Sequence, residues 1–453
     1  MRTKNQLGTE NLKTLMRKLA IPGIVAQLIN ILYNMVDRMY VGHMAKDASI
    51  SLTALGVCAP ILILISAFCN LVAFGASPLA SIELGKGENR QAEKILGTGF
   101  AFLIAISILL TAIVLIFKKP LIYLFGGTNN SYPFANSYLE IYVLGTISVL
   151  VSLGLNAMIV CQGKAKVAMF TIVIGAVSNI ILDPIFIYLL DMGVRGAALA
   201  TVISQTISAV FVIKFLISDK SQIRLKREYI KFDTVLIKSI LALGVSGFVM
   251  SATESAIIMV FNIGLIKHGG SLGDTYIGVM TILQSAMMLL FMPISGFTQG
   301  VQPIISYNFG ASNNERVVDT VKLMAKLTSL WTLAFCAFCY LLPAYFARIF
   351  TTDSNLIELI RKILPIFMAG MFLFGLQMTA QSFFVGTNQA KKSLFIALLR
   401  KVILLIPLAI ILPKYMGVMG VFWAEPISDL ISVTVCTILL IASLKKLDNL
   451  KAA

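Results

Sequence analysis

Long apolar runs separated by short clusters of charged residues dominate the pattern along this chain. Twelve of these runs are long enough, or nearly so, for a helix that crosses the ~30 Å hydrocarbon core of a bilayer. The first run follows a basic segment, but no small-residue cleavage site comes after it, so we expect a retained helix. The pattern therefore predicts an all-α integral membrane protein with twelve transmembrane helices, at about 19–43, 52–82, 95–117, 136–162, 167–190, 196–217, 240–267, 275–306, 318–343, 361–386, 392–412 and 418–444.

A repeat relates the two halves of the chain. The segment Met192–Ala198 returns as Met416–Phe422, about half the chain later, and Pro78–Gly85 corresponds in the same order to Pro303–Gly310. Each half holds six predicted helices, and this even number makes both copies start on the same side of the membrane. We therefore expect two six-helix lobes related by a pseudo-two-fold axis along the membrane normal, with a central cleft between them.

The repeat and the charge clusters also predict the limits of the parts. A cytoplasmic N-terminal segment precedes the N-lobe, a basic cytoplasmic linker joins the two lobes, and a short cytoplasmic tail follows the C-lobe. In that order, the predicted ranges are 1–18, 19–217, 218–239, 240–444 and 445–453.

Composition excludes a soluble domain, because 58% of the 453 residues are hydrophobic, only 13% are charged, and the mean hydropathy is +0.89. The net charge of +16 raises the question of whether the protein binds nucleic acid. If the N-terminus is cytoplasmic, however, most Lys and Arg fall on the cytoplasmic side, which is the positive-inside bias. We therefore expect a multi-pass protein of the cell membrane with both termini cytoplasmic, whose surroundings are the lipid bilayer and not nucleic acid.

Asp183 is the most informative charged residue, because it lies inside an apolar run and a charge there is costly. Asn179 precedes it by one helical turn and shares its face. Pro184 lacks an N–H, so the carbonyl of Ile180 is left without its helical partner. These hard oxygen donors suit a proton or a small cation such as Na⁺. The alternative is a proline kink in which Asp183 bonds a neighbouring helix.

Asp37 ends an apolar stretch and is followed by Arg38, so an interfacial pair that snorkels to the membrane surface explains it as well as a site does. Asp37, Asp183 and Thr201 all fall in the outer halves of their predicted helices. We therefore expect them at a similar depth in one lobe. Pro22 should kink the first helix near its start, which would let the segment that bears Asp37 move.

The second half carries its own intramembrane charges. Glu254 lies near the middle of its span with no basic neighbour in sequence, which suggests a proton carrier or a contact for a cationic substrate. A neutral, hydrogen-bonded core residue is the alternative. Gln284 is a candidate residue of the cavity.

Glu425 and Asp429 lie one turn apart on the last span, and Arg400 and Lys401 on the span before it. We favour a structural ion-pair network among these four residues, with a role in substrate binding as the alternative. The repeat aligns Glu425 with Thr201.

Several enzyme motifs are absent from the sequence. It contains no P-loop, no H-E-x-x-H and no nucleophile elbow. A membrane-embedded enzyme is therefore disfavoured, and we expect no cofactor. The six cysteines fall in predicted helices without zinc-type pairing, which favours core packing.

At this point the chain resembles the multidrug and toxic compound extrusion (MATE) transporters, within the superfamily that includes lipid-linked oligosaccharide flippases. The resemblance spans about residues 15–445. It rests on the twelve-helix repeat and on the following segments: Pro22 with Asn34 and Asp37, Ala76–Gly85, Gln162-Gly163, and Asn179-x-x-x-Asp183-Pro184 before Gly193–Ala198.

The resemblance implies secondary active efflux of amphipathic, mostly cationic compounds in exchange for H⁺ or Na⁺. One branch of the family implies an N-lobe cation site here at Asp37, Asn179, Asp183 and Thr201. Another branch uses acids in the seventh and tenth helices. Glu254 resembles the first of these acids, but the tenth helix here has no acid, so we favour coupling in the N-lobe.

Our hypothesis from the sequence is therefore a monomeric, polyspecific antiporter that works by rocking-type alternating access. Asn34, Glu254, Gln284, Arg400 and Glu425 are candidates for the substrate cavity or for a secondary proton site. Arg400 is unusual for a transporter of cations and would restrict its substrates. A flippase for a lipid-linked precursor is the first alternative, and it would need a basic cavity, for which only Arg400 and Lys401 are available.

Overall fold

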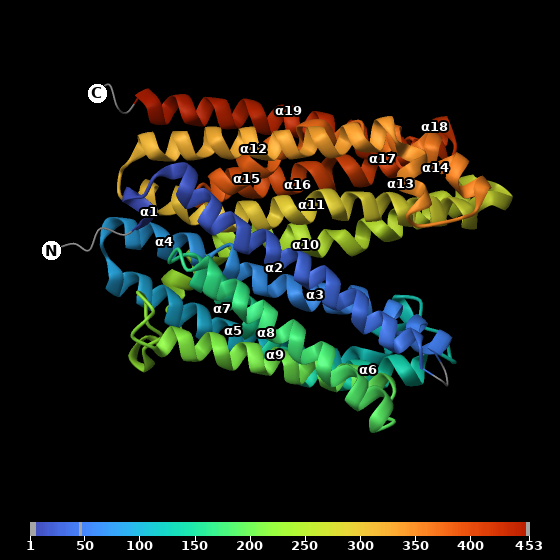
Figure 1. Cartoon of the computed structure of the whole chain (residues 1–453), viewed down its shortest axis with the longest axis horizontal. Coiled ribbons are helices and arrows are strands. Elements are labelled where there is room, and N and C mark those ends of the chain that lie inside the picture. The colour runs from blue at the N-terminus through green and yellow to red at the C-terminus, as the bar shows by residue number, and fades with distance from the viewer. Residues whose placement is uncertain (1–5, 45–47, 450–453) are drawn as a thin grey trace.

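The computed structural model describes residues 6–44 and 48–449, and within these ranges the chain forms helices and no strands (Figure 1). The N-terminal half contains α1 (Gln6–Thr9), α2 (Leu12–Gly42), α3 (Ala48–Ala73), α4 (Ala76–Lys86), α5 (Asn89–Leu124), α6 (Tyr132–Leu144), α7 (Thr146–Val160), α8 (Ala165–Pro184), the π-helix η1 (Ile185–Leu189) and α9 (Val194–Ile217).

After the short 3₁₀ turn η2 (Arg227–Tyr229), the C-terminal half contains α10 (Thr234–Gly269), η3 (Gly270–Leu272), α11 (Gly273–Gly310), α12 (Asn314–Leu341), α13 (Pro343–Arg348), α14 (Ser354–Phe367), η4 (Met371–Leu373), α15 (Phe374–Gly386), α16 (Ala390–Leu398), the π-helix η5 (Leu399–Leu405), α17 (Ile406–Ile411), α18 (Pro413–Met416) and α19 (Met419–Asn449).

The described residues contain the membrane spans that the apolar runs predict. Ten helical segments are long and apolar enough to cross a bilayer by themselves. Two bent pairs, α6 with α7 and α14 with α15, bring the number to twelve if each pair is one span. The all-α, twelve-helix fold class is thereby confirmed.

The two halves lie side by side, and both ends of the chain lie at one end of the molecule, called the terminal end below (Figure 1). Within the N-terminal half, α8 packs against α2 and α9, and within the C-terminal half, α15 packs against α12 and α19. The halves meet mainly along three contacts, α2 with α11, α3 with α10 and α4 with α11. We call this surface the seam.

Glycines that the repeat pairs with each other let the halves approach closely at the seam. A Cβ atom on Gly85 would lie 2.0 Å from the carbonyl oxygen of Tyr307, and one on Gly310 would lie 2.0 Å from the carbonyl oxygen of Ile82. No side chain fits at either position, so backbone packs directly on backbone, as small residues allow between membrane helices. The repeat therefore meets itself across the pseudo-two-fold axis.

Both bent pairs bend by 56°, and each bend falls at a glycine. Gly145 separates α6 from α7, and Gly370 lies between α14 and α15. The sequence analysis treats 136–162 and 361–386 as uninterrupted runs and so misses the bends. The signal was present, because the repeat places these two glycines at equivalent positions.

The short helix α1 lies at the seam on the terminal end. Leu7 is buried, and its side chain is the nearest to Gly163 of the N-terminal half. Its carbonyl oxygen accepts hydrogen bonds from Asn308 Nδ2 at 3.0 Å and from Arg316 Nε at 3.1 Å. Arg316 Nη2 also donates to the carbonyl of Glu10 at 2.6 Å. We call residues 6–10 the N-terminal clasp, because they connect both halves.

The basic linker between the halves is held to the N-terminal half. Lys226 Nζ pairs with Glu93 on α5 at 2.7 Å, and Arg90 Nε donates to the hydroxyl of Tyr229 at 3.0 Å. The hydrogen bond to Glu93 raises the pKa of Lys226 above its ordinary value. Its ammonium group is therefore charged at neutral pH, and loss of its proton weakens this contact only at strongly alkaline pH.

Candidate cation and substrate sites

The N-terminal half contains a buried polar cluster on α8. Asp183 is fully buried and Asn179 nearly so. Because they are one turn apart, the two side chains face the same way, and Asn179 Nδ2 donates to Asp183 Oδ1 at 3.2 Å. Helix α8 ends at Pro184, and the π-helix η1 follows directly. Such wide turns occur often at functional sites.

Three oxygen atoms of this cluster have no hydrogen-bond partner, although each is buried. They are Asp183 Oδ2, Asn179 Oδ1 and Asp37 Oδ1. Asp37 belongs to α2, which packs along α8, and its charge acts on that of Asp183. Buried polar atoms are normally hydrogen-bonded, and three of the thirteen unpartnered buried side-chain oxygens of the described residues lie on these two packed helices. Oxygen acceptors of this kind are the ligands that hard cations prefer.

Thr201, the remaining predicted member of the cation site, lies on a helix that packs against α8 but does not bond to the cluster. Thr201 is buried on α9, which packs against α8, and its hydroxyl donates to the carbonyl of Ala197 at 3.0 Å. No hydrogen bond joins it to Asp183. Asp37 forms no ion pair within 4 Å with Arg38, so the structure does not contain the snorkelling pair that the sequence left open.

The two prolines affect their helices differently. Helix α2 continues through Pro22 from Leu12 to Gly42 without a break, whereas α8 changes to a π-helix after Pro184. Asn34 is exposed on α2, and its side-chain amide donates to the carbonyl of Asn30 at 2.6 Å.

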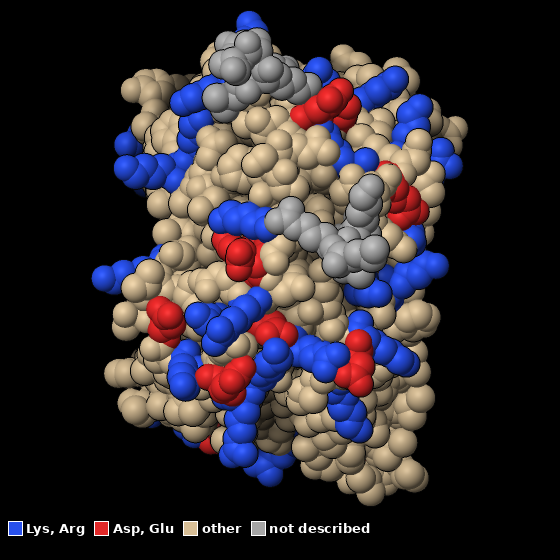
Figure 2. Space-filling model, turned by 90° about the vertical axis from the view of Figure 1, so that its left-hand side faces the viewer, with Lys and Arg blue, Asp and Glu red and all other residues tan. Residues whose placement is uncertain are grey.

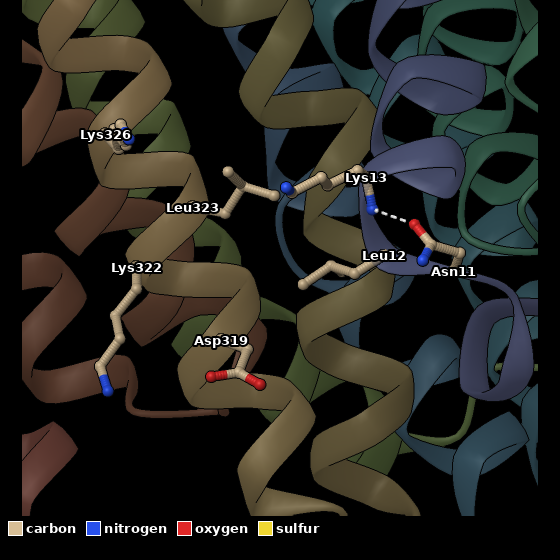
Figure 3. A pocket seen from close by; sticks show the side chains of 7 residues that line it. All are labelled: Asn11, Leu12, Lys13, Asp319, Lys322, Leu323 and Lys326. Carbon is tan, nitrogen blue, oxygen red and sulfur yellow. Dashed lines mark hydrogen bonds between the residues drawn. The ribbon is translucent and has the colours of Figure 1, made fainter.

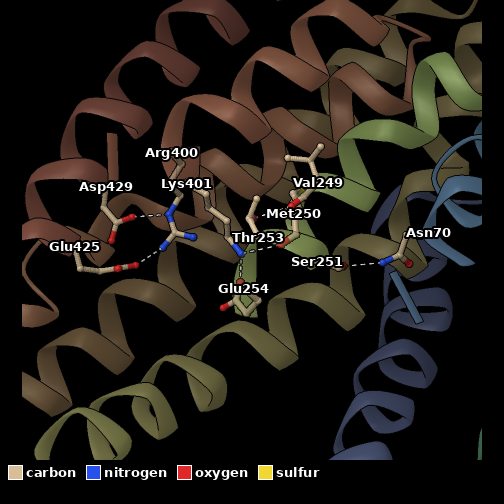
Figure 4. Close-up of polar contacts among 10 residues, drawn as sticks. All are labelled: Asn70, Val249, Met250, Ser251, Thr253, Glu254, Arg400, Lys401, Glu425 and Asp429. Carbon is tan, nitrogen blue, oxygen red and sulfur yellow. Dashed lines mark hydrogen bonds and ion pairs between the residues drawn. The ribbon is translucent and has the colours of Figure 1, made fainter. Parts of the chain in front are cut away.

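The polar cluster of the C-terminal half contains both basic and acidic side chains. Arg400 lies on the π-helix η5 and is buried. Its Nη2 contacts Glu425 Oε1 at 2.8 Å, and its Nε contacts Asp429 Oδ1 at 2.6 Å, as Figure 4 shows. The guanidinium group also lies 5.0 Å from the ring centre of Phe374. The network of Arg400 with both acids of α19 is thereby confirmed.

Lys401 does not join that network, which corrects the sequence analysis. Its ammonium group pairs with Glu254 on α10 and donates to the carbonyl of Met250 at 2.8 Å (Figure 4). Consecutive residues of a helix point in different directions, so Arg400 and Lys401 reach different neighbours. The side chain of Glu254 is 52% exposed and that of Lys401 11%. Glu254 is therefore not an isolated acid, although sequence shows no basic residue beside it.

A polar contact across the seam was not expected from the sequence. Asn70 Nδ2 on α3 donates to Ser251 Oγ on α10 at 2.8 Å (Figure 4). Gln284 is half-buried on α11, and its role in a cavity stays a prediction. A cavity of about 620 Å³ at the end opposite the termini, between α6 and the start of α9, is lined by none of the predicted site residues.

The part of the chain that the structure describes contains no cluster of side chains suited to metal or thiol chemistry. No group of three or more His, Cys, Asp and Glu side chains there could hold a metal ion. All six cysteines are free and buried, as expected for core packing.

Twelve candidate spans in two repeated halves, with a polar cluster inside each half, define a membrane protein built like the secondary transporters. The family model MatE matches residues 22–185 and 248–411, one copy in each half, so the chain belongs to the MatE family of transporters. The protein is thus a multi-pass membrane transporter and not an enzyme.

Individual relatives agree with this family. The chain is 24% identical over 414 residues to the multidrug export protein MepA of Staphylococcus aureus, which covers 91% of this chain and 90% of that protein. It is 25% identical over 435 residues to MepA of Staphylococcus haemolyticus, covering 96% and 93%. A crystal structure of MATE in the bent conformation superposes with a TM-score of 0.90 over the full length of both chains at 24% identity.

Proposed function

We propose that this protein is a secondary active exporter that expels small amphipathic, mostly cationic compounds in exchange for H⁺ or Na⁺. The observation that carries the proposal is the set of unpartnered buried oxygens on Asp37, Asn179 and Asp183. A proton or a sodium ion bound there would satisfy acceptors that otherwise stay unbonded in a low-dielectric interior.

The position of the cluster supports coupling between the ion and the shape of the transporter. Asp37 lies on α2, which contacts α8 of its own half and α11 across the seam. An ion that binds Asp37 and Asp183 together favours the arrangement of α2 in which the two carboxylates are close. The ion drives a change of shape only because it binds this arrangement more tightly than the other. Repacking of α2 would then alter the cleft and release the substrate on the outer side.

The distribution of charge supports an orientation in which the terminal end faces the cytoplasm. Figure 2 views the terminal end and shows Lys and Arg spread over this face in excess of Asp and Glu. By the positive-inside rule, we infer that this end faces the cytoplasm, with both termini on the cytoplasmic side of the cell membrane. A single chain supplies both halves of the cleft, so a monomer is sufficient for alternating access.

Substrates are inferred from the relatives and from the charge of the cleft residues. The relatives are named for multidrug export, and Glu254, which is half-exposed and paired with Lys401, is a candidate contact for a cation that displaces Lys401, with Asn34 and Gln284 as further polar contacts. The flippase alternative needs free basic residues to hold a diphosphate. Arg400 and Lys401 are both paired with carboxylates, which argues against it.

The test is export of the fluorescent cation ethidium from proteoliposomes under a proton gradient or a sodium gradient, each imposed separately. We expect transport under one of them, and its loss in Asp37→Asn and in Asp183→Asn. Asp191→Asn is the matched control, because Asp191 is exposed in the loop before α9 with a φ of 48°, a conformation that asparagine tolerates.

Wild-type export rates in the Asp183→Asn protein would refute coupling through this cluster. If the protein exports no cation under either gradient, and its thermal transition shows that it is folded, the result instead favours the flippase alternative.

A further inference from the structure

A basic cavity lies at the terminal end, where the first turn of α2 meets α12. Its volume is about 470 Å³, and its lining comes from both halves of the protein. Figure 3 shows Lys13 extended from α2 towards Leu323 of α12, with Lys322 and Lys326 on the same helix as Leu323. The sequence analysis does not single out this place, because its walls lie about 300 residues apart.

The charges of the cavity are not neutralised within the protein. Its lining holds Lys13, Lys322, Lys326 and one acid, Asp319, which leaves two positive charges in excess. Among the described residues, no ion pair within 4 Å involves any of these four side chains. Elsewhere on the terminal end, Lys18, Lys86 and Lys226 each pair with a glutamate, whereas Lys220 and Lys231 of the linker form no ion pair among the described residues. The cavity is therefore suited to an anion from outside the chain.

Beyond the exposed Arg17, which follows Lys13 by one turn, the surface that leads away from this cavity into the membrane is apolar. Ile21 follows Lys13 by two turns on α2 and is 56% exposed. Leu330 lies one turn beyond Lys326 on α12 and is 61% exposed, and Leu327 beside it is also exposed. Residues spaced by about four positions share one face of a helix. A ligand with a charged head and apolar tails fits this arrangement better than a free anion does.

The walls of the cavity also adjoin the N-terminal clasp, which connects the two halves. Asn11 lines the cavity and caps α2, since its Oδ1 accepts the N–H of Lys13 at 3.1 Å. On the other wall, Arg316 precedes Asp319 by one turn and holds the carbonyls of Leu7 and Glu10 in the N-terminal clasp. A ligand that bridges Lys13 and Lys322 would therefore reinforce the clasp.

We propose that this cavity binds the head group of an anionic phospholipid from the leaflet at the terminal end. Its phosphate contacts Lys13, Lys322 and Lys326, and its acyl chains lie along Ile21 and Leu330. The bound lipid holds the terminal ends of the two halves together. This inference goes beyond the proposed function and depends on neither the coupling ion nor the exported compound.

The experiment measures binding of phosphatidylglycerol to the full-length protein by native mass spectrometry, in micelles that also contain phosphatidylcholine. The variant K13Q/K322Q/K326Q is compared with K220Q/K231Q/K238Q, which removes the same charge from exposed lysines of the linker and the start of α10. We expect the first variant to bind on the order of 100-fold more weakly, because each surface lysine contributes about fivefold. The control should bind like the wild type.

Hydrogen exchange tests the structural consequence. Phosphatidylglycerol should slow amide exchange in residues 6–15 of the wild type and of the control, and not in the K13Q/K322Q/K326Q protein. Equal thermal transitions of all three proteins in phosphatidylcholine alone would show that the cavity variant is folded. Unchanged exchange in the wild type with lipid bound would refute the bridging role.

Two further arms identify the ligand. Asp319→Asn should tighten binding of phosphatidylglycerol, because it removes a repulsive carboxylate, whereas weaker binding would point to a zwitterionic head group and overturn the proposal. Protection of the clasp by inorganic phosphate or glycerol phosphate alone would identify a site for a soluble anion and would overturn it too. Equal loss of lipid in the cavity variant and the control would show non-specific attraction.

Discussion

The buried acids of the N-terminal half and those of the C-terminal half differ in their hydrogen-bond and ion-pair partners. In the N-terminal half, Asp183 bonds only the amide of Asn179, and oxygens of both residues lack a partner. In the C-terminal half, Arg400 contacts both Glu425 and Asp429, although one oxygen of Asp429 is also unpartnered. The first cluster is a net acceptor of positive charge, and the second contains its own cation.

This difference is informative because the two clusters occupy related places in a repeated fold. The repeat aligns Thr201, a neutral residue beside the first cluster, with Glu425, an acid of the second. Burial of unpaired charge is costly, and an internal ion pair reduces that cost without a transported ion. We infer that the N-terminal half is the site of ion exchange and that the Arg400 network serves mainly to hold α19 against η5.

Asn179→Lys should have the largest effect, because it gives the N-terminal cluster a cation of its own. An ammonium group one turn from Asp183 would occupy the place of the ion by direct attraction. We expect gradient-driven ethidium export to fall to the rate of protein-free liposomes while the thermal transition is kept. Asn129→Lys, which adds the same charge in an exposed loop, should export normally. Substantial export by Asn179→Lys would mean that the two halves do not differ in this way.

Arg400→Met should come next, and its effect is on stability. It removes the cation from two buried carboxylates, which typically costs about 3–5 kcal/mol. We expect a lower midpoint of thermal unfolding in detergent. Adding Glu425→Gln and Asp429→Asn to the same chain should recover most of that loss, because no buried charge then lacks a partner. If the triple variant is as unstable as the single one, packing of Arg400 on Phe374 matters more than its charge.

Lys401→Met should have the smallest effect. Glu254 is half-exposed, so loss of this ion pair should cost less than about 1 kcal/mol. Gradient-driven export should continue, and the freed acid should bind ethidium up to about fivefold more tightly, as measured by fluorescence titration. Lys401→Met combined with Glu254→Gln is the control and should abolish the gain. Loss of gradient-driven export in Lys401→Met alone would place coupling in the C-terminal half.

Much of the fold could be predicted because lipid imposes a simple rule on sequence. A span needs an apolar run of sufficient length, so hydropathy locates the helices. Their ends are less certain: α2 begins at Leu12, before the predicted start at 19, because Asn11 caps a basic first turn that hydropathy does not register. The bends at Gly145 and Gly370 were missed, since a broken span and a straight one have the same hydropathy.

The candidate site could be predicted in part. Asp183 and Asn179 are neighbours on one helix face, and a spacing of four residues is enough to place them together. Lys401 and Glu254 belong to different helices, and nothing in their sequence neighbourhoods indicates that they meet. The basic cavity was missed for the same reason, because its lysines are ordinary surface residues until α2 and α12 are brought side by side.

The sequence by itself determined the number of spans, the repeat, the polar pair on α8 and the family, because these depend on local composition and on spacing along one helix. Only the tertiary structure decided which charges are paired, where α1 crosses the seam and where Gly85 and Gly310 pack. Those features depend on contacts between helices that are distant in the chain. The buried acid Asp183 lacks a basic partner in one half, whereas Glu425 and Asp429 in the other half are paired with Arg400, according to what the neighbouring helix supplies.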